Sequence, residues 1–171
     1  MEDSASIRAA SIKLRKELKE LSNASNPAFS VGLVDEDNLF EWNVTLFGPP
    51  DTHYEGGIFK AVMKFPKNYP FEPPTLRFTS EMWHPNVYDD GRVCISILHR
   101  AEVDLSGYED LGERWSPAQT VETILISVIA MLSSPNDESP ANIDAAKMWR
   151  ENKPAYRRKV QRCVERSMED W

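Results

Sequence analysis

The sequence has few cysteines and no long apolar run. Only Cys94 and Cys163 occur, which is too few for a disulfide framework, so we expect both thiols to be reduced. No stretch approaches the roughly 18 consecutive apolar residues that a membrane span requires. Residues 1–11 lack the basic start and the apolar core of a signal peptide. We therefore expect a protein of the cytoplasm or nucleus with no membrane partner.

Positive charge is also scarce. Twenty basic residues stand against 27 acidic residues, which gives a formal net charge of −7. A protein that binds nucleic acid needs a basic surface to displace counterions from phosphates, so this balance argues against nucleic acid and favours protein partners. The composition, with 41% apolar and 27% charged residues, is typical of a single globular domain.

Patterns that bind nucleotides or metals are missing as well. Gly56-Gly57 is not followed by the lysine and the helix that a phosphate-binding loop needs. Cys94, His84 and His99 lack the paired spacing that supplies four zinc ligands. We expect the chain to hold no metal and no nucleotide.

Helical periodicity appears first at Ala5–Leu21. The apolar residues Ile7, Leu14, Leu18 and Leu21 fall on one stripe of a helix. The other face is expected to lie in solvent and to carry mostly basic residues, with two acidic ones: Arg8, Lys13, Arg15, Lys16, Lys19, Glu17 and Glu20. This charged face has two interpretations, a solvated surface or a surface that meets a partner.

Strands and then further helices follow. Runs rich in β-branched and aromatic residues predict four strands, at Phe29–Val34, Glu41–Phe47, Ile58–Phe65 and Thr75–Phe78. Their short connections favour an antiparallel meander. Three helices are then predicted: one from Val121 to Ser133-Ser134-Pro135, one at about Ala141–Glu151, and one with Pro154 in its first turn. Strands followed by helices are typical of an α+β fold.

A proline-rich loop joins the third and fourth strands. Four prolines lie between Phe65 and Leu76, and because proline fixes φ and donates no hydrogen bond, the loop is expected to be rigid. Phe71 lies inside this loop. The pattern alone favours a Phe71 that packs beneath its own loop over a Phe71 that is exposed to a partner.

The two cysteines have different surroundings. Cys163 lies at core spacing in the last predicted helix, which indicates a buried, inert thiol. Cys94 follows the turn Asp89-Asp90-Gly91-Arg92 in an irregular stretch, where a nucleophile is accessible. One interpretation is a cysteine hydrolase with His84 or His99 as the base, although none of the local cysteine-protease signatures surrounds Cys94.

Six fragments, taken in their order and spacing, resemble the ubiquitin-conjugating enzyme family. They are Phe47-Gly48-Pro49-Pro50, Tyr54-Glu55-Gly56-Gly57, Tyr69-Pro70-Phe71-Glu72-Pro73-Pro74, His84-Pro85-Asn86, Gly91 through Leu98, and Trp115-Ser116-Pro117. The resemblance implies one catalytic domain over residues 5–170. Its fold would have an N-terminal helix, a four-stranded antiparallel meander, an active-site loop and three C-terminal helices.

The resemblance also implies the chemistry. Cys94 would accept ubiquitin as a thioester from an activating enzyme that uses ATP, and would pass it to a lysine of a protein substrate. In the family, the asparagine that matches Asn86 is assigned to oxyanion stabilisation; the competing interpretation is that Asn86 braces the active-site loop. His84 and Pro85 are expected to hold the turn. No metal or other cofactor is required, because a thioester is already activated toward amines.

The stretch after the cysteine resembles the acidic-loop subclass of the family, closest to its G branch. Ser96 stands where most members have aspartate, and an insertion at about 100–114 carries Glu102, Asp104, Glu109 and Asp110. Members of this subclass favour lysine-48-linked polyubiquitin chains, which direct proteins to the proteasome. The acidic loop would orient the acceptor lysine and accept its proton, or it would simply be solvated. Ser139 stands where many members have an aspartate near the approaching lysine.

The resemblance also implies which residues bind the partner proteins. Lys13 and Lys16 would meet the activating enzyme, and Ile126 would contact the donor ubiquitin. A RING-type ligase would bind Phe71, Pro117 and Ala118, so the resemblance favours an exposed Phe71. Two other readings stay open: a catalytically silent binding module, and an enzyme for a different ubiquitin-like modifier.

Overall fold

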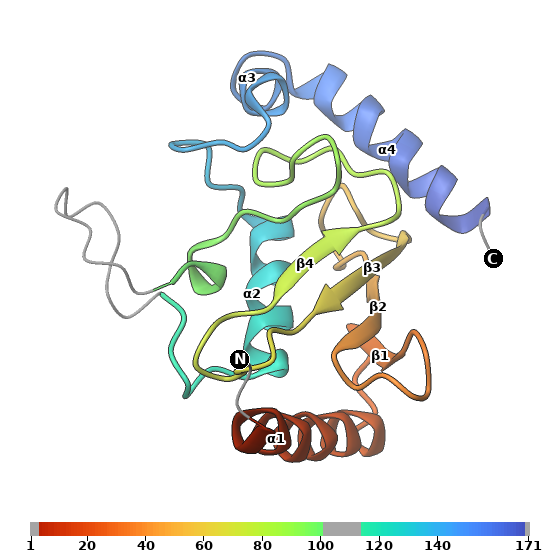
Figure 1. Cartoon of the computed structure of the whole chain (residues 1–171). Coiled ribbons are helices and arrows are strands. Elements are labelled where there is room, and N and C mark those ends of the chain that lie inside the picture. Colours follow the sequence, from red (N-terminus) through yellow and green to blue (C-terminus); the bar gives the residue numbers. More distant parts are fainter. Residues whose placement is uncertain (1–3, 101–113, 170–171) are drawn as a thin grey trace, which may run out of the picture.

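The computed structural model describes residues 4–100 and 114–169 (Figure 1). In chain order the elements are α1 (Ser4–Asn23), β1 (Phe29–Leu33), β2 (Glu41–Phe47), β3 (Ile58–Lys64), β4 (Thr75–Phe78), the short 3-10 helix η1 (Ser96–Leu98), α2 (Val121–Ser133), α3 (Ile143–Glu151) and α4 (Lys153–Glu169). The predicted order of elements and the α+β class are confirmed, and each predicted boundary lies within two residues of the observed one. Helix η1 was not predicted.

The four strands form one antiparallel meander in the order β1-β2-β3-β4. Alternate residues of neighbouring strands pair on the same face, so Val44 faces Ala61, which in turn faces Phe78. Leu46 and Phe59 form a second buried pair in the same register. This period of two gives the sheet one apolar face.

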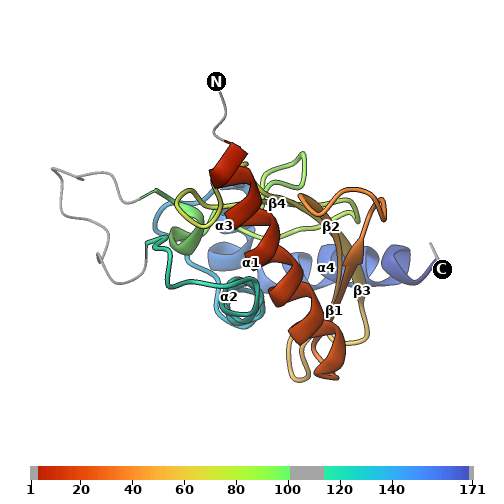
Figure 2. The ribbon, with the colours of Figure 1, turned by 60° about the horizontal axis from the view of Figure 1, so that its bottom comes forward.

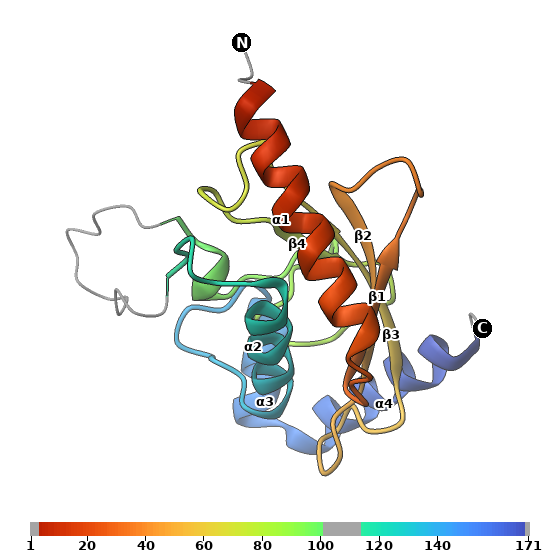
Figure 3. The same ribbon diagram turned by 90° about the horizontal axis from the view of Figure 1, so that it is seen from below.

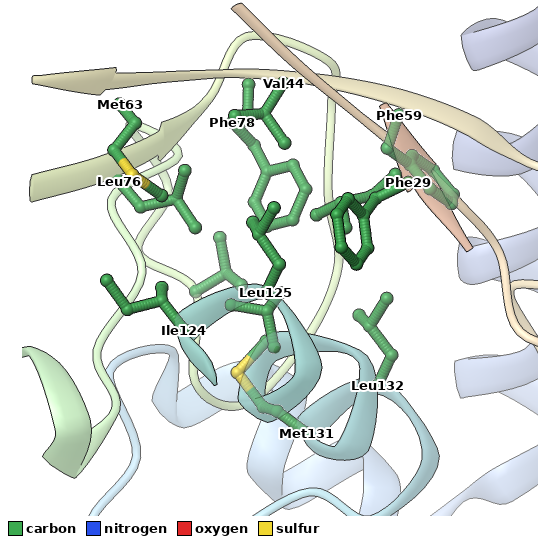
Figure 4. Packing of buried hydrophobic residues seen from close by; sticks show 14 of the residues in the cluster. Phe29, Val44, Phe59, Met63, Leu76, Phe78, Ile124, Leu125, Met131 and Leu132 are labelled. Carbon is green, nitrogen blue, oxygen red and sulfur yellow. The ribbon is translucent and has the colours of Figure 1, made fainter. Parts of the chain in front are cut away.

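Helix α2 covers that face. Figure 4 shows Ile124 and Leu125 of α2 pointing toward Phe78 and Leu76 of the sheet. The helix begins after Thr120, whose hydroxyl oxygen accepts the backbone N–H of Thr123, while the Thr123 side chain bonds back to the Thr120 backbone N–H. This reciprocal cap satisfies N–H groups that the first turn would otherwise leave unpaired. The start of α2 is therefore fixed in position.

Helix α1 lies across one end of the molecule, and in the view from below it passes in front of α2 and the sheet (Figure 3; Figure 2 shows it from an intermediate angle). Its buried residues are Ala10, Leu14 and Glu17. The placement of Glu17 on the solvent face was therefore wrong, because this carboxylate is only 7% exposed and points into the molecule. Hydrophobic periodicity cannot find such a residue, since it treats every charge as a sign of solvent.

Helices α3 and α4 complete the fold at the end of the molecule opposite α1 (Figure 1). Asn142 caps α3 by accepting the backbone N–H of Ala145. Helix α4 packs against β3 and α3 and buries Cys163, as its spacing predicted. Among the helices in the described part of the chain, none combines the length and the apolar character that crossing a membrane requires.

Candidate active site

Cys94 lies in a loop that returns from the Gly91 turn along the edge of the sheet. The backbone N–H of Phe78 donates to the Gly91 carbonyl at 2.8 Å, and the N–H of Val93 donates to the Leu76 carbonyl at 3.0 Å. The N–H of Cys94 itself donates to the Asn86 carbonyl at 2.9 Å. These bonds fix the backbone while the Cys94 side chain stays partly exposed. The arrangement presents a thiol on a rigid support.

The His84-Pro85-Asn86 turn is the other half of this support. The His84 ring is fully buried, and its Nδ1 accepts the backbone N–H of Asn86 at 2.9 Å. Its Nε2 lies 2.8 Å from the carbonyl oxygen of Met131, at the end of α2. Because Nδ1 is an acceptor, the ring proton sits on Nε2 and is donated to Met131. Both ring nitrogens are therefore occupied.

Burial lowers the pKa of His84 to about 4, and the bond to Met131 offsets only part of that effect. The ring is neutral at physiological pH and has no free nitrogen for a substrate proton. The hydrolase interpretation with His84 as the base is therefore wrong. His84 holds the turn against α2.

This burial predicts a pH dependence of folding. Below pH 6.5 the unfolded chain protonates His84, whereas the folded chain resists protonation down to about pH 4. Stability should therefore fall as the pH drops through this window, by at most roughly 3 kcal/mol from this residue. Urea unfolding of the wild type and of His84→Asn between pH 7 and pH 4.5 measures it. The variant should be less stable at pH 7 but less sensitive to acid; parallel pH curves would contradict the assignment.

Asn86 uses its side chain to hold the segment between α2 and α3. Its Nδ2 donates to the Asn136 carbonyl at 2.7 Å, and its Oδ1 accepts the Asn136 backbone N–H at 2.9 Å. The Asn86 side chain is nearly inaccessible, at 3% exposure. This two-bond pairing is the bracing geometry that the sequence left as one of two interpretations.

Pro85 completes the same attachment through its backbone. Its carbonyl oxygen accepts the N–H groups of Ala141 and Asn142 at 2.8 and 3.0 Å. The segment from Asn136 to Asn142 is thus tied at both ends to the turn that also holds the Cys94 backbone. Ser139 is exposed between these two attachment points.

Among the described residues, His99 is a titratable side chain that contacts the Cys94 thiol. The distance from Cys94 Sγ to His99 Nε2 is 3.8 Å, which is within contact range for sulfur. The carbonyl of His99 accepts the backbone N–H of Trp115 at 3.0 Å, so the two residues that flank the insertion are bonded to each other. Glu102, Asp104, Glu109 and Asp110 lie outside the described residues.

The predicted ligase residues lie on two neighbouring loops. Phe71 is 71% exposed, so the pattern-based expectation that it packs beneath its own loop was wrong. The reason is that Tyr69, at 1% exposure, fills that space instead. The indole N–H of Trp115 donates to the Pro70 carbonyl at 2.8 Å, which places the Phe71 loop beside the segment that carries Pro117 and Ala118, both exposed.

The other predicted partner residues are dispersed. Ile126 is 52% exposed on α2, and Lys16 is exposed on α1. Lys13 is only partly exposed, with its ammonium 3.7 Å from the Glu17 carboxylate. Within residues 4–100 and 114–169, no group of three or more histidine, cysteine, aspartate or glutamate side chains is placed to hold a metal ion.

Sequence reasoning missed a buried hydroxyl pair behind the turn. The hydroxyls of Tyr54 and Tyr156 lie 2.7 Å apart, and the Tyr54 hydroxyl donates to the Trp83 carbonyl at 2.6 Å. Burial raises the pKa of Tyr54 well above its usual range, so this hydroxyl stays protonated. The pair fixes the residue before His84 to α4. No sequence pattern pairs Tyr156 with Tyr54.

Comparison with known proteins identifies the family. A family model described as ubiquitin-conjugating enzyme matches residues 13–164. Ubiquitin-conjugating enzyme E2 7 of Arabidopsis thaliana is 62% identical over 160 residues, covering 94% of this chain and 96% of that relative. Ubiquitin-conjugating enzyme E2 G2 of Homo sapiens is 49% identical over 156 residues, covering 91% and 94%.

A solved structure agrees with these relatives. The structure of human ubiquitin-conjugating enzyme E2 G1 aligns with a TM-score of 0.66 and 52% sequence identity, over 74% of this chain and 96% of that one. The order of helices and strands and the position of the cysteine loop fit the fold that the resemblance implied. The chain therefore belongs to the ubiquitin-conjugating enzyme family, close to its G branch, and is a transferase.

Proposed function

We propose that the chain carries ubiquitin as a thioester on Cys94 and, with a RING-type ligase, builds lysine-48-linked chains that direct substrates to the proteasome. The observation that supports the thioester is the rigid presentation of a partly exposed thiol. The Cys94 backbone is bonded to Asn86, and the Asn86 side chain is bonded to the α2–α3 segment. The resemblance to the acidic-loop subclass supports the linkage.

The transfer step needs few catalytic groups from the protein. In the transfer step, the amine nitrogen of a lysine attacks the thioester carbonyl, a C–N bond forms, the C–S bond breaks, and the amine loses a proton. Because the thioester is already activated, no metal or nucleotide is needed on this chain. We assign Asn86 to holding the loop around this step. Its second amide hydrogen is the donor that would serve a developing oxyanion.

We assign to the acidic insertion the role of binding the incoming lysine. Glu102, Asp104, Glu109 and Asp110 supply negative charge that attracts a cationic side chain and accepts its proton. The hydrogen bond between His99 and Trp115 supports this assignment. These two residues flank the insertion, so the bond holds its two ends together near Cys94. Ser139 is a poor base, which leaves the proton to these carboxylates.

Chain assembly with altered ubiquitin tests the linkage. With activating enzyme, ATP and a RING-type ligase, wild-type ubiquitin should give chains, whereas ubiquitin whose lysine 48 is replaced by arginine should give single additions only. Chains of unchanged length with the altered ubiquitin would contradict the proposed linkage. Absence of any ubiquitin adduct would point to another ubiquitin-like modifier, and failure with such modifiers would favour a silent binding module.

Replacement of Phe71 tests the ligase surface. Phe71→Ala should leave charging of Cys94 intact and weaken ligase-stimulated transfer by about tenfold or more, as expected when an exposed apolar side chain at the centre of an interface is removed. Folding stability should change by less than about 0.5 kcal/mol, because Phe71 is exposed. Ile143→Ala is the matched control, since Ile143 on α3 is also 71% exposed. An equal loss in both variants would contradict a specific role.

A further inference from the structure

The buried carboxylate of Glu17 is not used by the proposed transfer chemistry. Its Oε2 accepts the Tyr69 hydroxyl at 2.6 Å, and its Oε1 accepts the backbone N–H of Val121 at 2.9 Å. The ammonium of Lys13 lies 3.7 Å from Oε2. A buried charge is costly unless it is paired and hydrogen-bonded, and here each carboxylate oxygen has a defined partner. Glu17 therefore holds a specific geometry.

The two oxygens hold two different loops. Tyr69 belongs to the Phe71 loop (residues 65–74), and Val121 is the first residue of α2, directly after the Pro117 loop (residues 115–120). The loops also touch each other, through the Trp115 indole N–H on the Pro70 carbonyl and through the Tyr69 and Trp115 rings, whose centroids are 5.8 Å apart. One carboxylate thus ties both loops to α1.

Both bonds are of the strong kind. The Tyr69 bond is short and has a charged acceptor, which makes it stronger than a bond between neutral groups. Burial, followed by the Glu17 hydrogen bond, raises the pKa of Tyr69, so its hydroxyl remains a donor. The Val121 N–H belongs to the first turn of α2, where a backbone N–H has no acceptor within the helix. The helix dipole also favours a carboxylate at this end of the helix.

Lys13 links this arrangement to the surface of α1. Its ammonium pairs with Glu17 and also lies 5.9 Å from the centre of the Tyr69 ring. Glu17 is therefore in contact with one residue of the predicted surface for the activating enzyme and with the supports of both predicted ligase loops. Periodicity gave no sign of this, because Glu17 was expected in solvent.

We propose that Glu17 is a positioning residue for the ligase: it fixes the Phe71 loop and the Pro117 loop relative to each other, so that Phe71, Pro117 and Ala118 form one apolar surface. The proposal rests on the proposed function, which supplies the ligase. Its partner is a ligase that grips both loops at once with apolar side chains. Loss of the carboxylate would let the loops move apart and weaken that grip.

The test compares Glu17→Ala with Glu17→Gln. Glutamine can still accept the Val121 N–H with its oxygen and donate its amide to the Tyr69 hydroxyl, whereas alanine can do neither. Discharge of the ubiquitin thioester onto free lysine is measured over a series of RING-ligase concentrations and without ligase, well below the melting temperature. Glu17→Ala should need about tenfold more ligase for half-maximal stimulation, on the scale of a lost charge-assisted hydrogen bond, and Glu17→Gln should restore most of it.

Controls separate positioning from general loss of structure. Glu20→Ala removes an exposed carboxylate from the same helix and should leave the ligase dependence unchanged. If Glu17→Ala does not fold, Tyr69→Phe removes one of the two bonds and keeps the ring contacts, and it should raise the half-maximal ligase concentration severalfold. A half-maximal concentration within twofold of wild type in the folded variant would overturn the proposal. So would an equal loss with and without ligase. Failure of the wild type itself to charge with ubiquitin would instead refute the proposed function.

Discussion

Replacement of Cys94 by alanine should abolish the ubiquitin adduct. The wild type, incubated with activating enzyme, ATP and ubiquitin, is expected to give a product that is lost under reducing conditions, because a thioester is cleaved by thiols. Cys94→Ala has no nucleophile at this position and should give no adduct. Cys94→Ser should give either a reductant-resistant ester or nothing. Non-reducing and reducing gels of the three proteins, run in parallel, measure the outcome.

The second cysteine provides the matched control. Cys163 is 2% exposed on α4, and burial raises the pKa of its thiol to about 11, so it should not react. Cys163→Ala should charge like the wild type and lose only stability, by roughly 1 kcal/mol for a small buried side chain. A reducible adduct that persists in Cys94→Ala and disappears in Cys163→Ala would refute the assignment of Cys94 as the carrier.

Gly91→Ala should be among the most damaging single substitutions in the chain. Gly91 has a φ of +94°, which L side chains rarely adopt, and an added Cβ would lie 2.1 Å from the Phe78 carbonyl oxygen. Strain and overlap together should cost roughly 3 to 5 kcal/mol, and lower the melting temperature by about 10 °C or more. Because Gly91 lies three residues before Cys94, charging should also slow. Thermal unfolding and the rate of thioester formation measure the two effects.

Substitutions at two other glycines separate the effect of backbone strain from the effect of steric overlap. Gly56 also has a positive φ, +85°, but an added Cβ there meets nothing within 4 Å, so Gly56→Ala should cost only the strain, about 1–2 kcal/mol. Gly32, in β1, has neither problem, and Gly32→Ala should change stability by less than about 0.5 kcal/mol. Equal melting temperatures for the Gly91 and Gly32 variants would contradict the structure around the Gly91 turn.

Local patterns explain why most of the fold was predictable. The alternation of apolar and polar residues in β2 and β3 indicates which side chains are buried, and so does the helical spacing in α2. Because the buried residues must share one face, the pairing of Val44 with Ala61 follows. Cys94 was found because a turn and an irregular stretch surround it. In these places the neighbouring residues along the chain carry the information.

Contacts between distant segments carry the rest, and no local pattern reports them. Glu17 looked like a solvent residue because its partners, Tyr69 and Val121, are far away in the sequence. The pairing of Asn86 with Asn136 joins residues 50 positions apart. Phe71 is exposed only because Tyr69 occupies the space beneath the loop. Each of these side chains has a role that depends on a partner which only the folded chain brings near.

The backbone bond between His99 and Trp115 also bears on how this family diversifies. This bond joins the two ends of the insertion and does not involve the residues between them. The Arg100 guanidinium, 2.9 Å from the Glu72 carboxylate, adds a second contact at the start of the insertion. Closure entropy grows only with the logarithm of loop length, so doubling the insertion costs only about 0.6 kcal/mol. The length and charge of this segment can therefore change without refolding the domain that carries Cys94.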